Sequence, residues 1–231
     1  MIKHLFLALF SLLMIGCAEL QQVANAMILT DDQVAFGLKD ALNQGIDKKV
    51  NALGATNGFF NNELVKIMLP EELQVVDNTL RKIGLAPLAD EGLKLLNRAA
   101  EDAVNESIPI FVDAVKGMTF NDARGILMGN KDAATDFLRS KTANALTAKF
   151  EPIIQNSLGK VGAEKVWTDL ITKYNSIPLV FNKVNPDLTN YVTNEALKGV
   201  FTVIEQEELE IRGKASNRST DLLKRVFALQ D

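Results

Sequence analysis

The sequence predicts an all-α fold, a compact multi-helix domain with a long helix near its C-terminus. From Thr30 onward, apolar residues recur with a period of about 3.6, and no sustained alternating pattern indicates a strand. Capping residues, glycine or proline stand at the ends of most of these stretches. The chain has 231 residues, 47% hydrophobic and 23% charged. A chain of this size buries roughly 70% of its unfolded surface, so it needs no disulfide or metal to fold.

The first helix is predicted to begin after Thr30 and to end at Gly54. Thr30 and Gln33 have the spacing of a capping box, in which each side chain binds a backbone amide of the other residue. Glycine favours helix termination. The stripe expected to be buried comprises Val34, Leu38, Ala41, Leu42, Ile46, Val50 and Leu53.

Two more helices are predicted to begin at prolines, which the first helical turn tolerates. The second runs from Pro70 to Gly84, and the third begins at Pro87. The third helix is expected to bury Leu88, Leu93, Leu96, Ala99, Ala100 and Ala103.

The middle of the chain predicts helices over 107–116, from Thr119 to Gly129, over 132–158 and over 163–175. Pro152 should kink or divide the helix that contains it, because proline lacks the amide that a helix interior uses. In the last of these helices, the expected buried residues are Val166, Trp167, Leu170 and Ile171.

The longest helix without an internal proline is predicted over 188–212, after an irregular connection over 177–186. Asp187 or Thr189 is expected to cap its beginning. A loop over 213–219 and a final helix over 220–229 complete the chain. The inward residues of the longest helix are expected to be Val192, Ala196, Val200, Val203, Ile204 and Ile211.

The first 28 residues indicate export and lipid attachment. Residues 1–16 have a lysine and then an apolar run too short to span a bilayer, which is typical of a signal peptide. Gly16 and Cys17 resemble the end of a bacterial lipobox, whose cysteine is diacylated and becomes the mature N-terminus. We therefore predict lipidation, including palmitate, at Cys17, a tether over 17–28 and a single helical domain over 29–231.

The residue after the cysteine predicts which membrane the protein is attached to. Ala18 stands where aspartate is the usual inner-membrane retention signal. By resemblance to that sorting rule, the protein is expected on the periplasmic face of the outer membrane. The alternative is a soluble periplasmic protein cleaved at Ala26, because Ala24-Asn25-Ala26 has the pattern of an ordinary signal-peptidase site.

Scarce residue types exclude several kinds of chemistry. The only histidine, His4, lies in the predicted signal peptide, and the only cysteine, Cys17, directly follows it. The mature domain therefore lacks the groups for Ser-His-Asp or Cys-His catalysis, and for the usual zinc sites. We predict no cofactor and no metal. The net charge of −4, without a basic block, indicates no nucleic-acid partner.

Two polar clusters stand within otherwise apolar helices and form the candidate polar site. The first comprises Asn97, Arg98 and Glu101, followed by Asp102; the second comprises Glu208 and Arg212 among further glutamates. Paired carboxylates can serve acid–base catalysis or bind a hard cation. The simpler interpretation is a solvated face or an interhelical salt bridge.

If a site exists, we expect it where the third helix meets the longest one. Arg98 or Arg212 should then neutralise Glu101 or Glu208, because an unpaired buried charge is costly. On that interpretation Glu101→Ala costs on the order of 3 kcal/mol by stranding a buried arginine.

Several short stretches, taken in order, resemble a bacterial family of domains of unknown function, number 4197. They run from about Leu29 to Phe227 and include Ala41-Leu-Asn-Gln-Gly45, Leu69-Pro-Glu-Glu-Leu73, Leu96-Asn-Arg-Ala-Ala-Glu101, Asn185-Pro-Asp-Leu-Thr189 and Thr220-Asp-Leu-Leu-Lys224. The resemblance implies an exported protein of Gram-negative bacteria, often a lipoprotein. It implies no activity and no catalytic residue.

Three functions remain open. The first is a non-catalytic envelope lipoprotein that binds an unknown envelope protein or polymer, and touches the membrane through Cys17. The second is a small-molecule binding protein with an interhelical cavity. The third is a carboxylate-dependent enzyme acting on envelope glycans, with two acids held a fixed distance apart.

Overall fold

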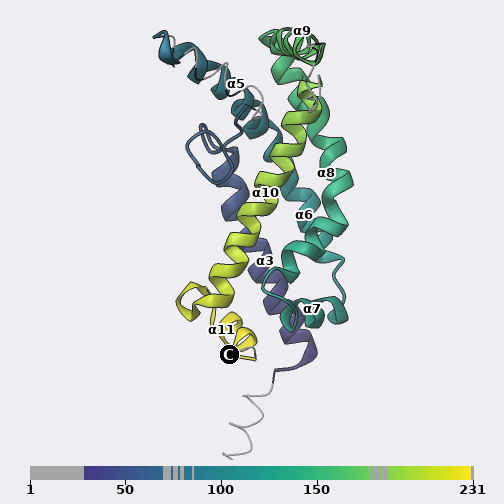
Figure 1. Ribbon diagram of the computed structural model, residues 1–231. Helices are drawn as coiled ribbons and strands as arrows, with labels where there is room; N and C mark the ends of the chain where they lie inside the picture. Colours follow the sequence, from purple (N-terminus) through teal and green to yellow (C-terminus); the bar gives the residue numbers. More distant parts are fainter. Residues whose placement is uncertain are drawn as a thin grey trace, which may run out of the picture.

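The computed structural model describes residues 29–69, 81–84, 86–176 and 187–229, together with residues 74, 78, 178 and 183. Within these residues every regular element is a helix, which confirms the all-α prediction. Figure 1 shows three long helices, α3 (Asp31–Gly54), α8 (Ala133–Lys160) and α10 (Leu188–Gly213), along the length of the bundle. Helix α10 packs against both α3 and α8, so it forms the centre of the arrangement.

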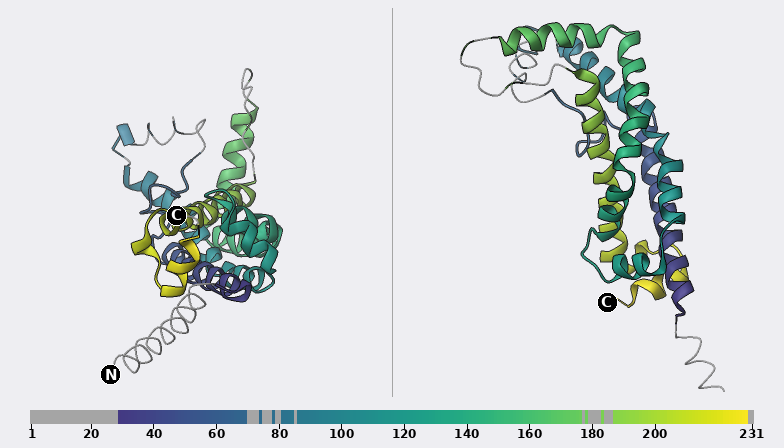
Figure 2. Two further views of the ribbon diagram at one scale, coloured as in Figure 1. Left: turned by 90° about the horizontal axis from the view of Figure 1, so that it is seen from below. Right: turned by 90° about the vertical axis from the view of Figure 1, so that its right-hand side faces the viewer.

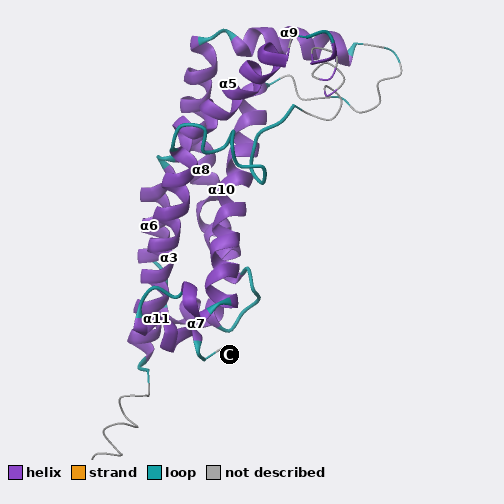
Figure 3. Cartoon of the chain, turned by 90° about the vertical axis from the view of Figure 1, so that its left-hand side faces the viewer, coloured by secondary structure: helices purple, strands orange, loops and turns teal. Residues whose placement is uncertain are grey.

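Shorter helices complete the bundle. They are α5 (Ala86–Val104), α6 (Ser107–Lys116), α7 (Phe120–Leu127), α9 (Ala163–Asn175) and α11 (Asp221–Phe227), with a 3₁₀ turn over Ala215–Asn217. Figure 2 shows α9 running across one end of the bundle, with α7 and α11 at the opposite end. Figure 3 shows that α7 and α11 lie beside the beginning of α3, where the described chain starts.

Side-chain caps fix the beginnings of several helices, and those of α3 and α10 agree with the sequence prediction. Thr30 and Gln33 form the capping box of α3. Thr119 and Asp122 form a second capping box at α7. Asp187 rather than Thr189 caps α10, and Thr220 caps α11.

Pro152 does not divide its helix, so of the two predicted outcomes, a kink or a division, the division is wrong. Helix α8 is continuous over 28 residues, with Pro152 inside it. A proline removes the amide that would bind the carbonyl four residues earlier, here that of Ala148. Both Pro152 and Ala148 are exposed, so water can bind that carbonyl and the helix continues.

Helix α7 ends at Leu127, earlier than the predicted Gly129. The last turn tightens, because the Gly129 amide binds the Ile126 carbonyl, and Arg212 donates further hydrogen bonds to the carbonyls of Ile126 and Leu127. The predicted helix from Pro70 to Gly84 and the connection over 177–186 lie largely outside the described residues. The single domain over 29–231 stays a prediction.

Two hydrophobic clusters fill the bundle. The main core lies between α3, α5, α6, α8, α9 and α10 and includes the fully buried Phe111, Phe150 and Ile154. The second cluster, here called the end core, joins the beginning of α3 to α7 and α11. The end core comprises Val34, Leu38, Ala41, Met118, Ala123, Ile126, Leu127, Ala134, Ile211, Leu223, Val226 and Phe227.

The predicted buried stripes of α3, α5, α9 and α10 face these clusters, and the half-buried Leu42 packs against both of them. The side chains of Leu88, Val166 and Leu170 lie outside the described set. The helical period therefore identified the inward faces of the bundle correctly wherever the structure describes them.

A non-helical segment over 55–69 follows α3 and packs back onto the bundle. Asn57 has a positive φ of 62°, a conformation that asparagine tolerates better than most residues. A Cβ atom on Gly58 would lie 2.3 Å from the carbonyl oxygens of Ala52 and Leu53, so only glycine fits there. The turn directs Phe59 into the main core.

Candidate functional site

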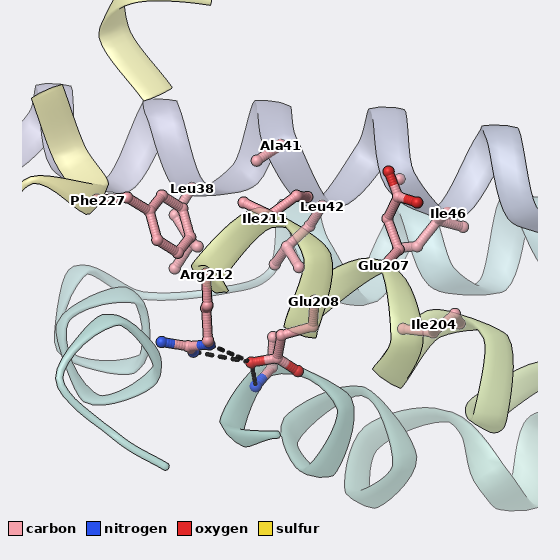
Figure 4. Close-up of a pocket in the computed structure, with 12 residues that line it drawn as sticks. Leu38, Ala41, Leu42, Ile46, Ile204, Glu207, Glu208, Ile211, Arg212 and Phe227 are labelled. Carbon is pink, nitrogen blue, oxygen red and sulfur yellow. Dashed lines mark hydrogen bonds and ion pairs between the residues drawn. The ribbon is translucent and has the colours of Figure 1, made fainter. Parts of the chain in front are cut away.

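Glu208 and Arg212, predicted as one polar cluster, form a buried ion pair one turn apart on α10. Arg212 Nη2 and Nε donate hydrogen bonds of 2.8 and 3.0 Å to Glu208 Oε1. Figure 4 shows the two side chains pointing toward each other at the junction of α10 with the beginning of α8. The pairing agrees with the expectation that an arginine neutralises a buried glutamate here.

The Glu208 carboxylate also caps α8 from a different helix. Its oxygens accept hydrogen bonds from the amides of Ala134 and Thr135, each at 2.9 Å, and from the Thr135 hydroxyl at 2.8 Å. The first amides of a helix lack intrahelical acceptors and carry a partial positive charge, so a carboxylate is stabilised there. Asp132, the residue in the N-cap position of α8, makes no side-chain capping bond.

Arg212 performs the complementary task at the end of α7. Its guanidinium donates hydrogen bonds to the carbonyls of Ile126 at 2.8 Å and Leu127 at 3.2 Å. A cation is favourable at the C-terminus of a helix, where carbonyls are unpaired. Glu208 and Arg212, hereafter the α10 clasp, therefore hold the end of α7 and the beginning of α8 together.

A small pocket between α3 and α10 borders the α10 clasp (Figure 4). It encloses about 30 Å³ of free space, roughly the room that one water molecule occupies. Typical small-molecule pockets measure roughly 300–1,000 Å³. The pocket is therefore a packing defect beside the clasp, too small for an organic ligand. It is lined by Leu38, Ala41, Leu42, Gly45, Ile46, Ala134, Ile204, Glu207, Glu208, Ile211, Arg212 and Phe227.

The other predicted cluster, on α5, holds the segment over 55–69. Asn97 accepts a hydrogen bond of 2.8 Å from the Ile67 amide and donates one of 2.9 Å to the Ile67 carbonyl. The Glu101 carboxylate accepts hydrogen bonds from the amides of Asn57 at 3.1 Å and Phe59 at 3.2 Å. Asn97 and Glu101, hereafter the α5 clasp, are both buried.

Arg98 lies beside the α5 clasp but is exposed. This corrects the expectation that the arginine paired with Glu101 is buried. Its guanidinium lies 3.4 Å from Glu101 and 3.0 Å from Asp102. Its side chain is 52% exposed, whereas that of Arg212 is 10% exposed. Removing Glu101 therefore strands two backbone amides and leaves Arg98 in water, so the predicted reason for a cost, a stranded buried arginine, is wrong.

The two clasps lie at different levels of the bundle. Glu207, the neighbour of Glu208, binds Lys48 of α3 at 3.1 Å, whereas Glu101 binds the segment that follows Gly54. At 1.5 Å rise per residue these levels are roughly 10 Å apart along α3. Helices α5 and α10 do pack against each other, but their polar residues bind different partners. A ligand-binding role for the five predicted residues stays a prediction.

A polar cleft that the sequence did not reveal lies between α8, α9 and the beginning of α10. Its open volume is about 460 Å³. The lining combines carboxylates, amides and hydroxyls from three helices that are distant in the sequence, so no local motif signals it. The lining residues are Glu151, Gln155, Glu164, Thr168, Asp187, Thr189 and Asn190.

Two exposed aspartates have altered acidity because they bind at helix ends. Hydrogen bonds from the Thr119 side chain and amide lower the pKa of Asp122. A hydrogen bond from Lys224, with the charge of that lysine, lowers the pKa of Asp221. Both carboxylates stabilise the first turn of a helix, so their altered pKa values reflect structure.

The described part of the chain contains no group of three or more His, Cys, Asp or Glu side chains placed to hold a metal ion. Within the same residues, none of the helices combines the length and apolarity needed to cross a bilayer. Cys17, the predicted lipidation site, lies outside the described residues.

Comparison with known proteins identifies the family. No curated protein and no solved structure matches the chain significantly. One family model, described as a protein of unknown function and designated DUF4197, matches residues 28–228. This match covers nearly all of the described helices and agrees with the resemblance seen in the short sequence stretches. The chain therefore belongs to the DUF4197 family of proteins of unknown function.

Proposed function

We propose that the protein is a lipid-anchored protein of the bacterial envelope whose helical domain is a non-catalytic binding module. One observation carries the non-catalytic part. The buried carboxylates of the described residues, Glu101 and Glu208, both bind backbone amides. A carboxylate that holds two amides stabilises the fold and is poorly placed to exchange a proton with a substrate.

The lipid anchor is supported by the position of the only cysteine. Cys17 follows an apolar run and a glycine, where a lipobox places its modified residue. Each buried methylene contributes about 0.8 kcal/mol to membrane binding, and two or more acyl chains anchor a protein stably. We place the domain on the periplasmic face of the outer membrane on the strength of Ala18.

Membrane fractionation of Cys17→Ser tests the anchor. The variant should lose acyl labelling and move from the membrane to the soluble periplasmic fraction. Mass spectrometry of the mature wild-type N-terminus provides the matched observation, because it distinguishes an acylated Cys17 from a start at Met27. A Cys17→Ser protein that remains membrane-bound would contradict the anchor.

Photo-crosslinking in cells tests binding. A photoreactive residue at exposed positions such as Val161 and Lys160, far from the beginning of α3, should yield one recurrent adduct with an envelope protein or polymer. The control is the same photoreactive residue in a chain that Phe111→Asp unfolds, because an unpaired carboxylate at this fully buried position is very costly. The unfolded chain should yield no such adduct. Adducts that are equally frequent with the unfolded control would contradict a binding module.

A carboxylate enzyme acting on envelope glycans is the second candidate, favoured by the acids around the open cleft. Glycosidases require two carboxyl groups at a fixed separation. Glu151 and Glu164 lie on different helices that border this cleft. Incubating purified peptidoglycan with the wild type and with a Glu151→Gln/Glu164→Gln variant should release no fragments in either case. Release by the wild type alone would replace our proposal with the enzyme.

A further inference from the structure

The end of the bundle at which the described chain begins is formed by the start of α3 with α7 and α11. Leu29, the first of the continuous described residues, lies where α3 starts, and α7 and α11 lie beside it (Figures 1 and 3). Contacts of α3 with both short helices enclose the end core. If Cys17 is acylated, this end is the part of the domain closest to the anchor.

Large apolar side chains at this end point away from the end core. Phe36 of α3 is 66% exposed, Met128 after α7 is 64% exposed, and Leu229 after α11 is 55% exposed. Each belongs to a segment whose neighbouring residues, Leu38, Leu127 and Phe227, are buried in the end core. The other large apolar side chains exposed in the described residues, Leu64, Met68, Ile83 and Val161, lie elsewhere. Proximity to Cys17 therefore singles out Phe36, Met128 and Leu229 as candidates for contact with a membrane.

We infer that this end of the bundle rests on the lipid bilayer and inserts Phe36, with Met128 and Leu229, into its interface. The inference rests on the proposed lipid anchor. Residues 18–28 form a tether of eleven residues. Eleven residues span at most roughly 40 Å, so Leu29 lies within that distance of Cys17.

The short tether makes weak apolar contacts effective. A domain held this close to the bilayer has a high effective concentration at its surface, so contacts too weak to recruit a free domain become populated. Apolar side chains contribute by entering the boundary between headgroups and acyl chains. The occupant of this surface is thus the membrane that holds the anchor.

Charge does not oppose this arrangement and does not drive it. The exposed charged residues of this end include both signs, namely Arg124, Lys131, Lys224 and Arg225 with Asp31, Asp32 and Asp221. Because neither sign dominates, the contact should depend weakly on salt and on the content of anionic lipid. This distinguishes apolar insertion from the adsorption of a basic patch.

Fluorescence quenching by brominated lipids tests the inference directly. The mature domain is coupled through the Cys17 thiol, the only thiol in the chain, to a maleimide lipid in phosphatidylethanolamine vesicles with a minority of phosphatidylglycerol. Chemical coupling replaces biological acylation, so the result does not depend on the proposed anchor. A single tryptophan is introduced by Phe36→Trp in a Trp167→Phe background, and circular dichroism confirms that each variant is folded.

Leu64→Trp in the same background is the matched control. Leu64 is 63% exposed, like Phe36, but lies in the segment that follows the other end of α3. Brominated acyl chains should quench the tryptophan at position 36 several-fold more than the tryptophan at position 64. If Trp167→Phe does not fold, the comparison is made with Trp167 retained, after subtraction of its own quenching on the same vesicles.

The outcomes separate the inference from the proposed function. Equal or absent quenching at positions 36 and 64 overturns the inference, even if Cys17→Ser releases the protein from cell membranes. Strong quenching at position 36 supports the inference, even if the cellular anchor is disproved. Concentration-dependent dimers without quenching would show that a second copy covers this surface, and would also overturn the inference.

Discussion

The α10 clasp and the α5 clasp use the same chemistry in different surroundings. In each, a glutamate on a helix accepts hydrogen bonds from two consecutive or nearly consecutive amides of a distant segment. The α10 clasp pairs its glutamate with a buried arginine at 2.8 Å. The α5 clasp has an exposed arginine at 3.4 Å, and an asparagine supplies its remaining bonds.

The difference shows how burial decides what a polar residue contributes. Removing one partner of a buried ion pair leaves an uncompensated charge in a poorly solvated place. An exposed arginine that loses its partner is solvated by water instead. We therefore expect the α10 clasp to be sensitive to substitution of either charged residue, and the α5 clasp to be sensitive only at the residues that bind the backbone.

The largest effect is expected from Glu208→Ala. The substitution strands Arg212 and the amides that begin α8, so it should lower the free energy of unfolding by about 3–5 kcal/mol. Urea denaturation measures this loss.

Glu207→Ala is the matched control for Glu208→Ala. Glu207 binds Lys48 and Lys49, whose ammonium groups can reach water once the glutamate is removed, so its loss should cost only about 1 kcal/mol. Equal losses of unfolding free energy at the two neighbouring positions would show that the α10 clasp stabilises the fold no more than the neighbouring surface ion pairs do.

Glu101→Ala should have the next largest effect. The substitution leaves the amides of Asn57 and Phe59 without their acceptor, and we expect a loss of about 1–3 kcal/mol. Faster hydrogen exchange of these two amides, measured by NMR, should accompany the lower stability. Unchanged exchange together with loss of a bound envelope component would instead make Glu101 a binding residue.

Arg98→Met should have a smaller effect and sharpens the contrast between the two arginines. Because Arg98 is solvated, its loss should cost less than about 1 kcal/mol, and high salt should abolish the difference from the wild type. Thermal melts at low and high ionic strength check this. Arg212→Met, in the same assay, should remain strongly destabilised at both salt concentrations.

Asp122→Asn should have the smallest effect, visible as a change in pH dependence. Binding to Thr119 lowers the pKa of Asp122 in the folded protein. The unfolded chain therefore binds a proton more readily than the folded one. The Asp122 carboxylate contributes its full stability at pH values above the ordinary aspartate pKa. That stability is lost as the pH falls through the lowered pKa of the folded state. Thermal melts should show the variant less stable at neutral pH and equal to the wild type in strong acid.

The sequence predicted the helices and their inward faces because both depend on local spacing. The capping boxes at Thr30 and Thr119 and the stripe of α3 follow from residues within a few turns of one another. The role of Glu208 does not, because its amide partners lie 73 and 74 residues away. The same holds for Glu101 and the segment over 55–69, whose turn at Gly58 has no helical signature. The possible division at Pro152 was not borne out, because solvent exposure, which decides the cost of a missing amide, depends on tertiary packing.

A double-mutant cycle on Glu208→Ala and Arg212→Ala tests most directly whether the α10 clasp is a structural unit. The unfolding free energies of the wild type, both single variants and the double variant are measured by urea denaturation. If the residues act together, they should be coupled by roughly 2–3 kcal/mol, and the double variant should lose little more than either single variant. Losses that add within about 0.5 kcal/mol, or single variants as stable as the wild type, would contradict the account.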